Sequence, residues 1–373
     1  MKVGLIGLPE VGKTALFNAL TRQNAAINTF GGVSNEVHLG TVPVPDPRFD
    51  FAVEVCQPKK QTPATVDITD GGARVQLDEG SASSGGGKKE KFGTDFFAGV
   101  RNMDALVLVL RAFKSDALPE PPAGVDPGRD AQRIAEELLI ADLTIIEGRL
   151  DRLEKNKLMK RSTPAEAVEH QTLSKIKDHL EALNPVRTLE MTEDEQKSVR
   201  SFAFVSGKPL ILVANIGEDD LGGDLAITAG LRAFAKENNL ELVELCAKVE
   251  MEVSQMESDD EREFLSAMGI EEPARDKLVR AAYAALGYIS FFTVGEDEVR
   301  AWTIRTGTNA VGAAEKIHTD IARTFIRAET MAFDEFRSAG TWEAAKAAGK
   351  MRLEGKEYVV KDGDILHIRN SRG

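Results

Sequence analysis

One short segment near the start of the chain combines the residue types that bind a nucleotide phosphate. Residues 7–14 read Gly-Leu-Pro-Glu-Val-Gly-Lys-Thr and match the pattern G-x-x-x-x-G-K-[ST]. Glycines let backbone N–H groups wrap around phosphate oxygens, and a helix that begins there adds positive potential. Lys13 would reach the β- and γ-phosphates, and the hydroxyl of Thr14 would ligate Mg²⁺. The segment predicts a nucleoside triphosphate site; the alternative is an ordinary strand–turn–helix corner.

Three other segments carry the remaining chemistry that such a site needs. A loop hydroxyl senses Mg²⁺ and the γ-phosphate, and Ser34, within residues 28–39, is the candidate, although it is equally typical of a plain loop serine. An acidic residue at a strand end holds Mg²⁺ through water, and Asp67 fits. Residues 215–218, Asn-Ile-Gly-Glu, follow an apolar run as a base-binding loop does, although asparagine is also a common turn residue.

These residues lie at the ends of short apolar runs that alternate with helical patterns. The run Lys2–Gly7 precedes the glycine-rich turn, and Lys13–Arg22 follows it with apolar residues on one face of a helix. Further apolar runs are Ala64–Ile68, Ala105–Phe113, Pro209–Ala214 and Glu241–Cys246. Such an alternation predicts an α/β fold with a doubly wound, mainly parallel sheet that is covered on both faces.

Two segments interrupt this alternation. Gly80–Lys91 is rich in glycine, serine and lysine and predicts a flexible surface loop. Later, leucine and isoleucine recur every three or four residues on both sides of a Ser-Thr-Pro turn at 162–164, which predicts an antiparallel coiled-coil hairpin. The seam residues are Leu139, Leu143, Ile146, Leu150, Leu153, Leu173, Ile176, Leu180 and Leu183.

The expected tip of this hairpin is basic. Its cationic residues are Arg149, Arg152, Lys155, Lys157, Lys160 and Arg161. A solvated surface is the simpler interpretation, and a finger that contacts phosphates is the alternative. From about residue 288, short strand-like runs surround a helix expected near Asn309–Phe325, which predicts a small α+β module. These runs are Ile289–Val294, Val299–Ile304, Glu357–Val360 and Ile365–Ile368.

Composition limits the class of protein. With 373 residues, 42% of them apolar, the chain has length for two or three domains of about 150 residues each. It contains no apolar run of the roughly 20 residues that span a bilayer and begins with no signal-peptide pattern, so we expect a cytoplasmic protein without membrane contact. Its two cysteines exclude a disulfide scaffold. The net charge of −13 means that any RNA contact requires a local basic patch.

Several motifs together resemble the YchF subfamily of Obg-related P-loop proteins, the Obg-like ATPases, over nearly the whole chain. They are GLPxVGKTxLFNALT at Gly7–Thr21, GTVPVPDPR at Gly40–Arg48, KPLILVANIGE at 208–218, LGYISFFTVGEDEVRAWTIRTGT at Leu286–Thr308, IHTDIARTFIRAE at Ile317–Glu329 and RLEGKEYVVKDGDILHIRN at Arg352–Asn370. The resemblance implies a P-loop nucleotide-binding domain, a helical coiled-coil insertion and a C-terminal TGS domain of β-grasp fold. The expected boundaries are 1–128 with 201–287, 129–200, and 288–373.

The resemblance also implies a ligand, a metal and a partner. It implies ATP rather than GTP, because Asn215 and Glu218 preserve the subfamily's Asn-x-x-Glu in place of the Asn-Lys-x-Asp that reads guanine. Cys246-Ala247-Lys248 resembles the loop that also borders the base. Mg²⁺ is the expected cofactor. The ribosome is the expected partner, contacted through the TGS domain and the helical hairpin, with RNA contact through the hairpin tip and the TGS domain.

The expected site residues follow from the motifs and the resemblance together. The nucleotide is expected to contact Gly7, Pro9, Glu10, Val11, Gly12, Lys13, Thr14, Ala15, Asn215, Ile216, Glu218, Cys246 and Ala247. The expected catalytic residues are Lys13, Ser34 and Asp67, and the expected magnesium ligands are Thr14, Ser34 and Asp67.

Four departures from the subfamily pattern lie in the nucleotide machinery. Glu10 replaces an Asn that helps related GTPases hold a monovalent cation, which makes a K⁺ site doubtful, and its carboxylate would repel phosphate unless it turns outward. Ser34 stands where the loop hydroxyl is usually Thr. The Asp-x-x-Gly switch corresponds to Asp67-Ile68-Thr69-Asp70-Gly71, in which the Gly either comes one residue late or is replaced by Asp70. Finally, the His implicated in hydrolysis is missing, and its position falls near Glu120.

These observations lead to a ranked expectation of function. The leading hypothesis is a ribosome-associated, ATP-binding switch with slow Mg²⁺-dependent hydrolysis. The alternative is a non-hydrolysing nucleotide-binding or ribosome-interaction module with a degenerate switch. A GTPase is the third hypothesis, and the missing Asn-Lys-x-Asp argues against it.

Overall fold

The structure is a computed structural model that describes residues 1–25, 37–71, 75–78, 89–121, 123–159, 163–221, 223, 225–267 and 272–371. The chain forms two compact units. Unit 1 comprises Met1–Gly40 and Asp67–Leu278, and unit 2 comprises Thr41–Val66 and Val279–Gly373. These units differ from the expected domains, because the expected nucleotide-binding domain included residues 41–66 and the structure places them in unit 2. The reason is that the middle of this segment contacts C-terminal residues, through Arg48 with Asp362 and through residues 60–62 with β11, which local sequence patterns do not reveal.

The core of unit 1 is a six-stranded sheet in the order β2-β4-β1-β7-β8-β9. Its strands are β1 (Lys2–Ile6), β2 (His38–Pro43), β4 (Thr65–Asp70), β7 (Ala105–Ala112), β8 (Leu210–Ile216) and β9 (Glu241–Leu245). The neighbours from β4 to β9 pair in parallel. Every residue of β7 and β8 is buried, as in a sheet covered on both faces. The expected α/β class is confirmed, with some strand ends shifted by one or two residues.

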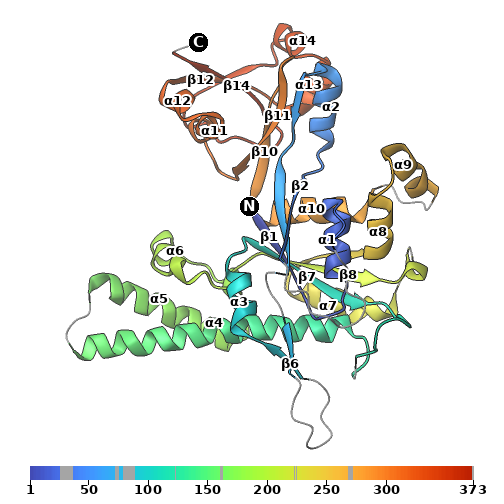
Figure 1. Cartoon of the computed structure of the whole chain (residues 1–373). Helices are drawn as coiled ribbons and strands as arrows, with labels where there is room; N and C mark the ends of the chain where they lie inside the picture. Colours follow the sequence, from blue (N-terminus) through green and yellow to red (C-terminus); the bar gives the residue numbers. More distant parts are fainter. Residues whose placement is uncertain are drawn as a thin grey trace, which may run out of the picture. The chain divides into compact units, whose positions relative to one another are not determined.

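Helices cover both faces of this sheet (Figure 1). On one side α1 (Lys13–Thr21) contacts α8 (Ala247–Ser254), and on the other α4 (Pro127–Leu158) contacts α7 (Ala229–Glu237). The chain also forms α3 (Thr94–Arg101), α6 (Glu193–Val199), α9 (Ser258–Ala267), α10 (Ala274–Ala285) and the pair β5 (Val75–Asp78) and β6 (Lys89–Phe92). Strand β6 includes the end of the loop predicted at Gly80–Lys91, and the preceding residues 79–88 lie outside the described part of the chain. None of the described helices is long and apolar enough to cross a membrane.

The two helices predicted from the leucine pattern are α4 and α5 (Pro164–Glu181), which contact each other. Most of the expected seam side chains lie in one buried cluster: Leu139, Ile146, Leu153, Leu173, Ile176 and Leu180. The N-terminus of α5 is closed by a capping box, in which Thr163 and Glu166 satisfy each other's backbone N–H groups. Leu143 and Leu150 are partly buried against this cluster, whereas Leu183 follows the end of α5 and is exposed, so its place in the predicted seam is corrected.

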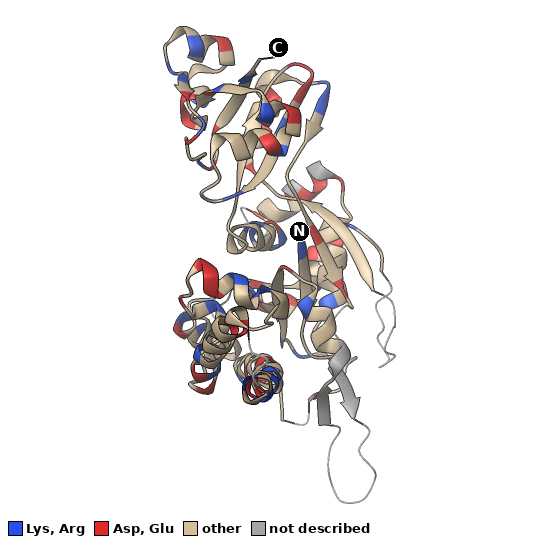
Figure 2. Ribbon diagram, turned by 90° about the vertical axis from the view of Figure 1, so that its left-hand side faces the viewer, with Lys and Arg blue, Asp and Glu red and all other residues tan. Residues whose placement is uncertain are grey.

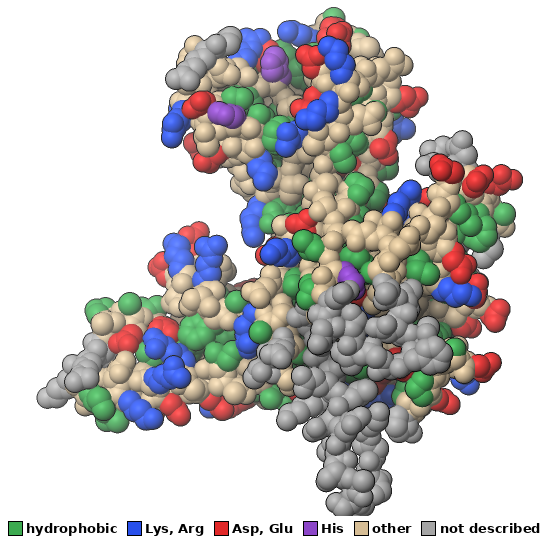
Figure 3. All heavy atoms as spheres, in the orientation of Figure 1, with side chains coloured by type: hydrophobic (Ala, Val, Ile, Leu, Met, Phe, Trp, Pro, Cys, Tyr) green, Lys and Arg blue, Asp and Glu red, His purple; other side chains and the backbone are tan. Residues whose placement is uncertain are grey.

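Charged side chains of both signs are interspersed along α4 and α5 (Figures 2 and 3). Arg149 pairs with Glu169 at 2.8 Å, so this member of the basic tip serves the packing of the two helices. Arg152, Lys155 and Lys157 are exposed, and the remaining tip residues 160 and 161 lie outside the described part of the chain. The ion pair with Glu169 favours the simpler interpretation for Arg149, a surface residue without a phosphate partner. The exposed cations at the end of α4 are Arg152, Lys155 and Lys157.

The core of unit 2 is a second six-stranded sheet, in the order β13-β12-β14-β10-β11-β3. Its strands are β3 (Lys60–Thr62), β10 (Tyr288–Thr293), β11 (Glu298–Arg305), β12 (Phe325–Met331), β13 (Arg352–Glu354) and β14 (Ile365–Asn370). Its helices are α2 (Pro47–Cys56), α11 (Ala310–Ile317), α12 (Thr319–Arg323), α13 (Phe333–Ala339) and α14 (Trp342–Ala347). The expected mixture of strands and helices after residue 288 is confirmed.

Two predicted elements of unit 2 need correction. The helix expected over 309–325 is divided at His318, whose Nδ1 accepts a backbone N–H at the start of α12. The strand expected over 357–360 is wrong: the segment makes an isolated bridge between Val359 and Asn309, next to the start of α11. Its apolar residues Tyr358 and Val360 pack against α11 and the sheet without pairing as a strand, while Val359 is exposed.

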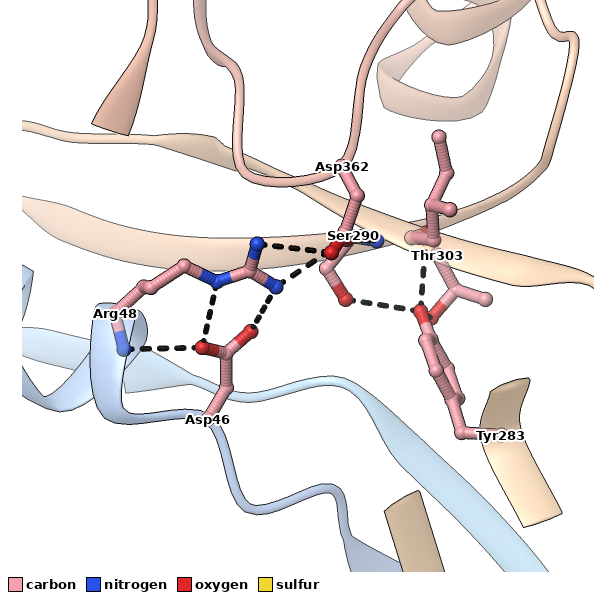
Figure 4. A network of polar contacts seen from close by, with 7 residues as sticks. Asp46, Arg48, Tyr283, Ser290, Thr303 and Asp362 are labelled. Atoms are coloured by element: carbon pink, nitrogen blue, oxygen red, sulfur yellow. Dashed lines mark hydrogen bonds and ion pairs between the residues drawn. The ribbon is translucent and has the colours of Figure 1, made fainter. Parts of the chain in front are cut away.

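A polar network fastens residues 41–66 to the rest of unit 2 (Figure 4). The guanidinium of Arg48 donates to both oxygens of Asp46 at 2.9 Å, and to both oxygens of Asp362 at 2.9 and 3.2 Å. Asp362 also accepts the backbone N–H of Ser290 at 2.9 Å, and the guanidinium lies 5.6 Å from the ring centroid of Phe292. One cation thus joins α2, β10 and the turn before β14, while β3 pairs in parallel with β11.

We expect Arg48→Met to destabilise unit 2 by about 1–3 kcal/mol, because two carboxylates lose the cation that they share. Both tryptophans, Trp302 and Trp342, lie in unit 2, so urea unfolding followed by tryptophan fluorescence reports on this unit. The control is Lys59→Met, which removes a cation from a highly exposed pair with Asp297 and should change the free energy of unfolding by less than about 0.5 kcal/mol. Equal effects of the two substitutions would contradict this role for Arg48.

Candidate functional site

The turn between β1 and α1 adopts backbone conformations that its glycines permit. Gly7 and Gly12 have φ of +148° and +95°. A Cβ at Gly7 would lie 2.3 Å from the carbonyl oxygen of Val109, and one at Gly12 would lie 2.2 Å from Nδ2 of Asn215. Neither position therefore admits a side chain. The turn leads into the amino end of α1, where the first N–H groups and the helix dipole favour an anion.

The ammonium group of Lys13 lies over this turn. Its Nζ donates to the carbonyl oxygens of Gly7 and Leu8 at 3.0 and 2.6 Å. The predicted phosphate-binding cation is thus held inside the loop that would surround the phosphates. Pro9 and Ala15 flank the same turn, while the side chain of Val11 is buried, so Val11 presents only its backbone to a ligand.

Asp70, and not Asp67, is the carboxylate that meets Thr14. The hydroxyl of Thr14 donates to Oδ2 of Asp70 at 2.8 Å, and Asp70 is 4% exposed. Strand β4 extends two residues beyond its predicted end, so Asp70 closes it at the edge where the turn after β1 lies. A buried carboxylate beside a Thr hydroxyl is the arrangement that holds Mg²⁺ through water in phosphate-binding turns.

Asp67 lies three residues earlier, in the middle of β4. It pairs in register with Lys2, the first residue of β1, and its carboxylate is 3.7 Å from the amino group of Met1. Three residues along a strand span about 10 Å and reverse the face, so Asp67 and Asp70 cannot exchange roles. The structure therefore places Asp70, and not the predicted Asp67, beside Thr14.

The side chain of Asn215 joins the loops that were expected to surround the base. It is 5% exposed; its Nδ2 donates to the carbonyl oxygen of Val11 and its Oδ1 accepts the N–H of Ala247, both at 2.9 Å. Asn215 lies within β8 rather than in the turn after it, and Ile216, which ends the strand, is buried. One amide thus ties the phosphate-binding turn to the start of α8.

Two charged groups complete this corner of the site. Glu218 follows β8, Lys248 lies in the first turn of α8, and the Glu218 carboxylate accepts from the Lys248 ammonium at 2.7 Å. This hydrogen bond raises the pKa of Lys248, so its side chain stays protonated. Burial raises the pKa of the Cys246 thiol, which stays neutral beside them. The corner can therefore accept a hydrogen bond from an amino group on a base.

Two buried polar residues near the site were missed from the sequence. Asn18 fastens the chain after α1, because its amide exchanges two hydrogen bonds with the backbone of Ala25, at 2.8 and 2.9 Å. Arg111 ends β7 and donates to the carbonyl oxygens of Phe113 and Pro119 at 3.2 and 3.1 Å, which shapes the loop before α4. The available signal was the same in both cases: a polar residue inside an otherwise apolar pattern.

Thr14 and Asp70 are two side chains at the turn whose oxygens could contribute to a Mg²⁺ site. No cluster of three or more His, Cys, Asp or Glu side chains among the described residues could hold a metal by itself. Mg²⁺ usually takes one or two protein ligands and completes its shell with phosphate and water, so this pair suits it. Ser34, the other predicted ligand, lies outside the described residues. Glu120, at the position of the missing His, is exposed on the loop after β7.

Glu10 adopts a conformation that its side chain disfavours. Its φ is +62°, a left-handed value that costs a residue with a Cβ roughly 1–2 kcal/mol, and that Asn tolerates better than Glu. We expect Glu10→Gly to be more stable than Glu10→Ala by about 1 kcal/mol, because both remove the carboxylate and only Ala keeps the Cβ. Differential scanning calorimetry of the two variants measures this. Identical melting would contradict the left-handed conformation.

The chain is similar to known proteins in sequence and in fold. The family model for a 50S ribosome-binding GTPase matches residues 2–137, and the YchF-GTPase_C model, described as a protein of unknown function, matches residues 288–371. The structure of the Schizosaccharomyces pombe YchF GTPase superimposes with a TM-score of 0.82 at 30% sequence identity, covering 99% of this chain and 97% of that chain.

Curated relatives match over their full length. The ribosome-binding ATPase YchF of Bacillus subtilis is 38% identical over 99% of both chains, and that of Escherichia coli O157:H7 is 36% identical over 98% of both. Obg-like ATPase 1 of Caenorhabditis elegans is 34% identical over 100% of this chain and 93% of its own. With the glycine-rich turn, the Thr14–Asp70 contact and the Asn215 bridge in place, these matches show that the chain belongs to the YchF family.

Proposed function

We propose that this protein is a cytoplasmic, ribosome-associated switch that binds ATP with Mg²⁺ and hydrolyses it slowly. The observation that carries the proposal is the convergence of Lys13, Thr14 and Asp70 on the turn after β1, with Asn215 tying that turn to the base-binding corner. A cation, a hydroxyl and a carboxylate at a helix amino end suit a magnesium triphosphate. The relatives' names, ribosome-binding ATPase, support both the ligand and the partner.

In this proposal the residues act as follows. Backbone N–H groups of residues 10–13 and the Lys13 ammonium hold the phosphates. Thr14 and Asp70 hold Mg²⁺, with Ser34 as a further proposed ligand. Mg²⁺, when bound, offsets charge on the β- and γ-phosphates. Asn215 positions the base-binding corner, and the Glu218 carboxylate accepts from an amino group of the base.

We assign no residue of this chain to position the attacking water, so the proposed hydrolysis is slow. Phosphoryl transfer is catalysed mainly by positioning and charge stabilisation. Glu120 replaces the family's His and is exposed, and Glu10 brings a carboxylate to the phosphate-binding turn where the family has Asn. Both changes affect the γ-phosphate end of the site and not its base-binding corner. They support the second candidate, a module that binds ATP without hydrolysing it.

The proposed ribosome contacts lie on two parts of the chain. The α4–α5 helices, taken as the coiled-coil insertion, end in the exposed cations Arg152, Lys155 and Lys157. Unit 2, taken as the TGS domain with residues 41–66 added, supplies the other surface. Because the whole chain carries a net charge of −13, contact with RNA is expected only where cations gather, as they do at the end of α4.

We expect calorimetric titration with ATP in Mg²⁺ buffer to show saturable binding that Lys13→Ala weakens by roughly tenfold to a hundredfold, because a charge-assisted contact to phosphate is lost. Turnover assayed with Mg²⁺ and K⁺ separates the two candidates, since a non-hydrolysing module binds without turnover. Ribosome cosedimentation with and without ATP gives the second readout. Cosedimentation that ignores both ATP and Lys13→Ala would end the switch proposal, and absence of nucleotide binding at millimolar ATP would end both.

The corrected metal ligand gives a matched pair of variants. We expect Asp70→Asn to lower the Mg²⁺-dependent part of ATP affinity by about tenfold, because the carboxylate charge facing the ion is lost. Asp67→Asn makes the same substitution on the same strand, three residues earlier, and should leave ATP affinity within about twofold of the parent. Titrations with Mg²⁺ and with EDTA measure the difference. A larger loss from Asp67→Asn would restore the original assignment.

A further inference from the structure

The base-binding corner contains an ion pair that folding does not require. Glu218 begins the short 3-10 helix Glu218–Asp220 after β8, and Lys248 lies on α8 after β9, so the pair joins two adjacent loops at one edge of the sheet. The side chains of Lys248 and Glu218 are 61% and 48% exposed. An exposed ion pair of this kind contributes little to the free energy of unfolding. We therefore ask how it affects the binding of a ligand at this corner.

The pair changes how many hydrogen bonds Glu218 can accept from a base. Lys248 Nζ donates to Oε2 of Glu218 at 2.7 Å and takes one of that oxygen's two acceptor positions, so Oε1 is the less engaged oxygen. Guanine presents two adjacent donors, N1–H and the 2-amino group, which a carboxylate with two free oxygens accepts side by side. Adenine presents a single exocyclic amino group, which needs only one oxygen. With Oε2 held by Lys248, Oε1 suits the base that offers one donor.

We propose that Lys248 is a specificity-determining residue that favours adenine over guanine nucleotides by holding one oxygen of Glu218. The proposal rests on the proposed function, namely that this site binds a purine nucleoside triphosphate. It assigns the discrimination to the pair and not to Glu218 alone, because an unpaired glutamate at the same place could accept both guanine donors. The hydrogen bond that raises the pKa of Lys248 keeps the ammonium charged, and hence paired, at neutral pH.

The test is the ratio of the dissociation constants for ATP and GTP, measured by calorimetry on the full chain in Mg²⁺ buffer. We expect Lys248→Met to shift this ratio toward GTP by roughly three- to tenfold, about the effect of one hydrogen bond. In the Glu218→Ala background, the same Lys248→Met substitution should leave the ratio unchanged, because the carboxylate that it frees is gone. This double-mutant cycle isolates the pair from any separate effect of the lysine.

Lys236→Met is the matched control for charge. Lys236 is exposed in the last turn of α7, before β9 begins, whereas Lys248 follows the end of β9, so the two lysines lie at opposite edges of the sheet. This variant should leave the ratio unchanged. If Lys248→Met leaves the ratio unchanged, shifts it toward ATP, or acts equally without Glu218, the inference is overturned while the proposed function stands. If the parent protein binds neither nucleotide, the proposed function itself fails.

Discussion

The nucleotide site depends on one buried amide. Asn215 donates to the carbonyl of Val11 and accepts from the N–H of Ala247, so a single side chain sets the spacing between the phosphate-binding turn and α8. A buried amide that loses a partner leaves an unsatisfied group at a cost of about 1–3 kcal/mol, which makes this spacing hard to alter. The same amide explains the glycine at position 12, because a Cβ there would lie 2.2 Å from Nδ2 of Asn215. Asn215 therefore holds the phosphate-binding turn and the start of α8 at a fixed distance from each other.

The position of Asp70 changes how the departures from the family pattern are interpreted. An acidic residue that seemed to oppose the γ-phosphate instead accepts from Thr14, where a magnesium site needs negative charge. Of the other departures, Glu10 lies in the turn between β1 and α1, and Glu120 is exposed on the loop after β7. Phosphoryl transfer is catalysed mainly by positioning and charge stabilisation, so changes in the proposed catalytic groups need not abolish nucleotide binding.

The path of the chain links the two units through the segment that follows α1. Residues 41–66 leave unit 1, contribute α2 and β3 to unit 2, and return in β4 to the edge where Asp70 meets Thr14. Arg48 holds this excursion in unit 2 by joining two carboxylates that are 316 positions apart in the chain (362 − 46). Neither unit is therefore a continuous stretch of sequence, and each needs distant residues to complete its sheet.

The sequence by itself determined the parts that depend on near neighbours. The apolar runs predicted the strands around the site, the leucine spacing predicted the buried faces of α4 and α5, and the motif at residues 7–14 predicted the turn. Each signal is local, because strand and helix periodicity and glycine conformations are properties of a few consecutive residues. Motifs of the same kind also indicated the family, which the comparisons confirmed.

Only the tertiary structure decided which of two acidic residues meets Thr14, that residues 41–66 belong with the C-terminal unit, and that Lys248 holds Glu218. The first depends on the length of β4 and on its register against β1. A shift of three residues along β4 moves a side chain to a different level of the strand and to the opposite face of the sheet. The other two depend on contacts between segments far apart in the chain. Such contacts are set by which strands pair and how helices pack on them, and no local pattern encodes their geometry.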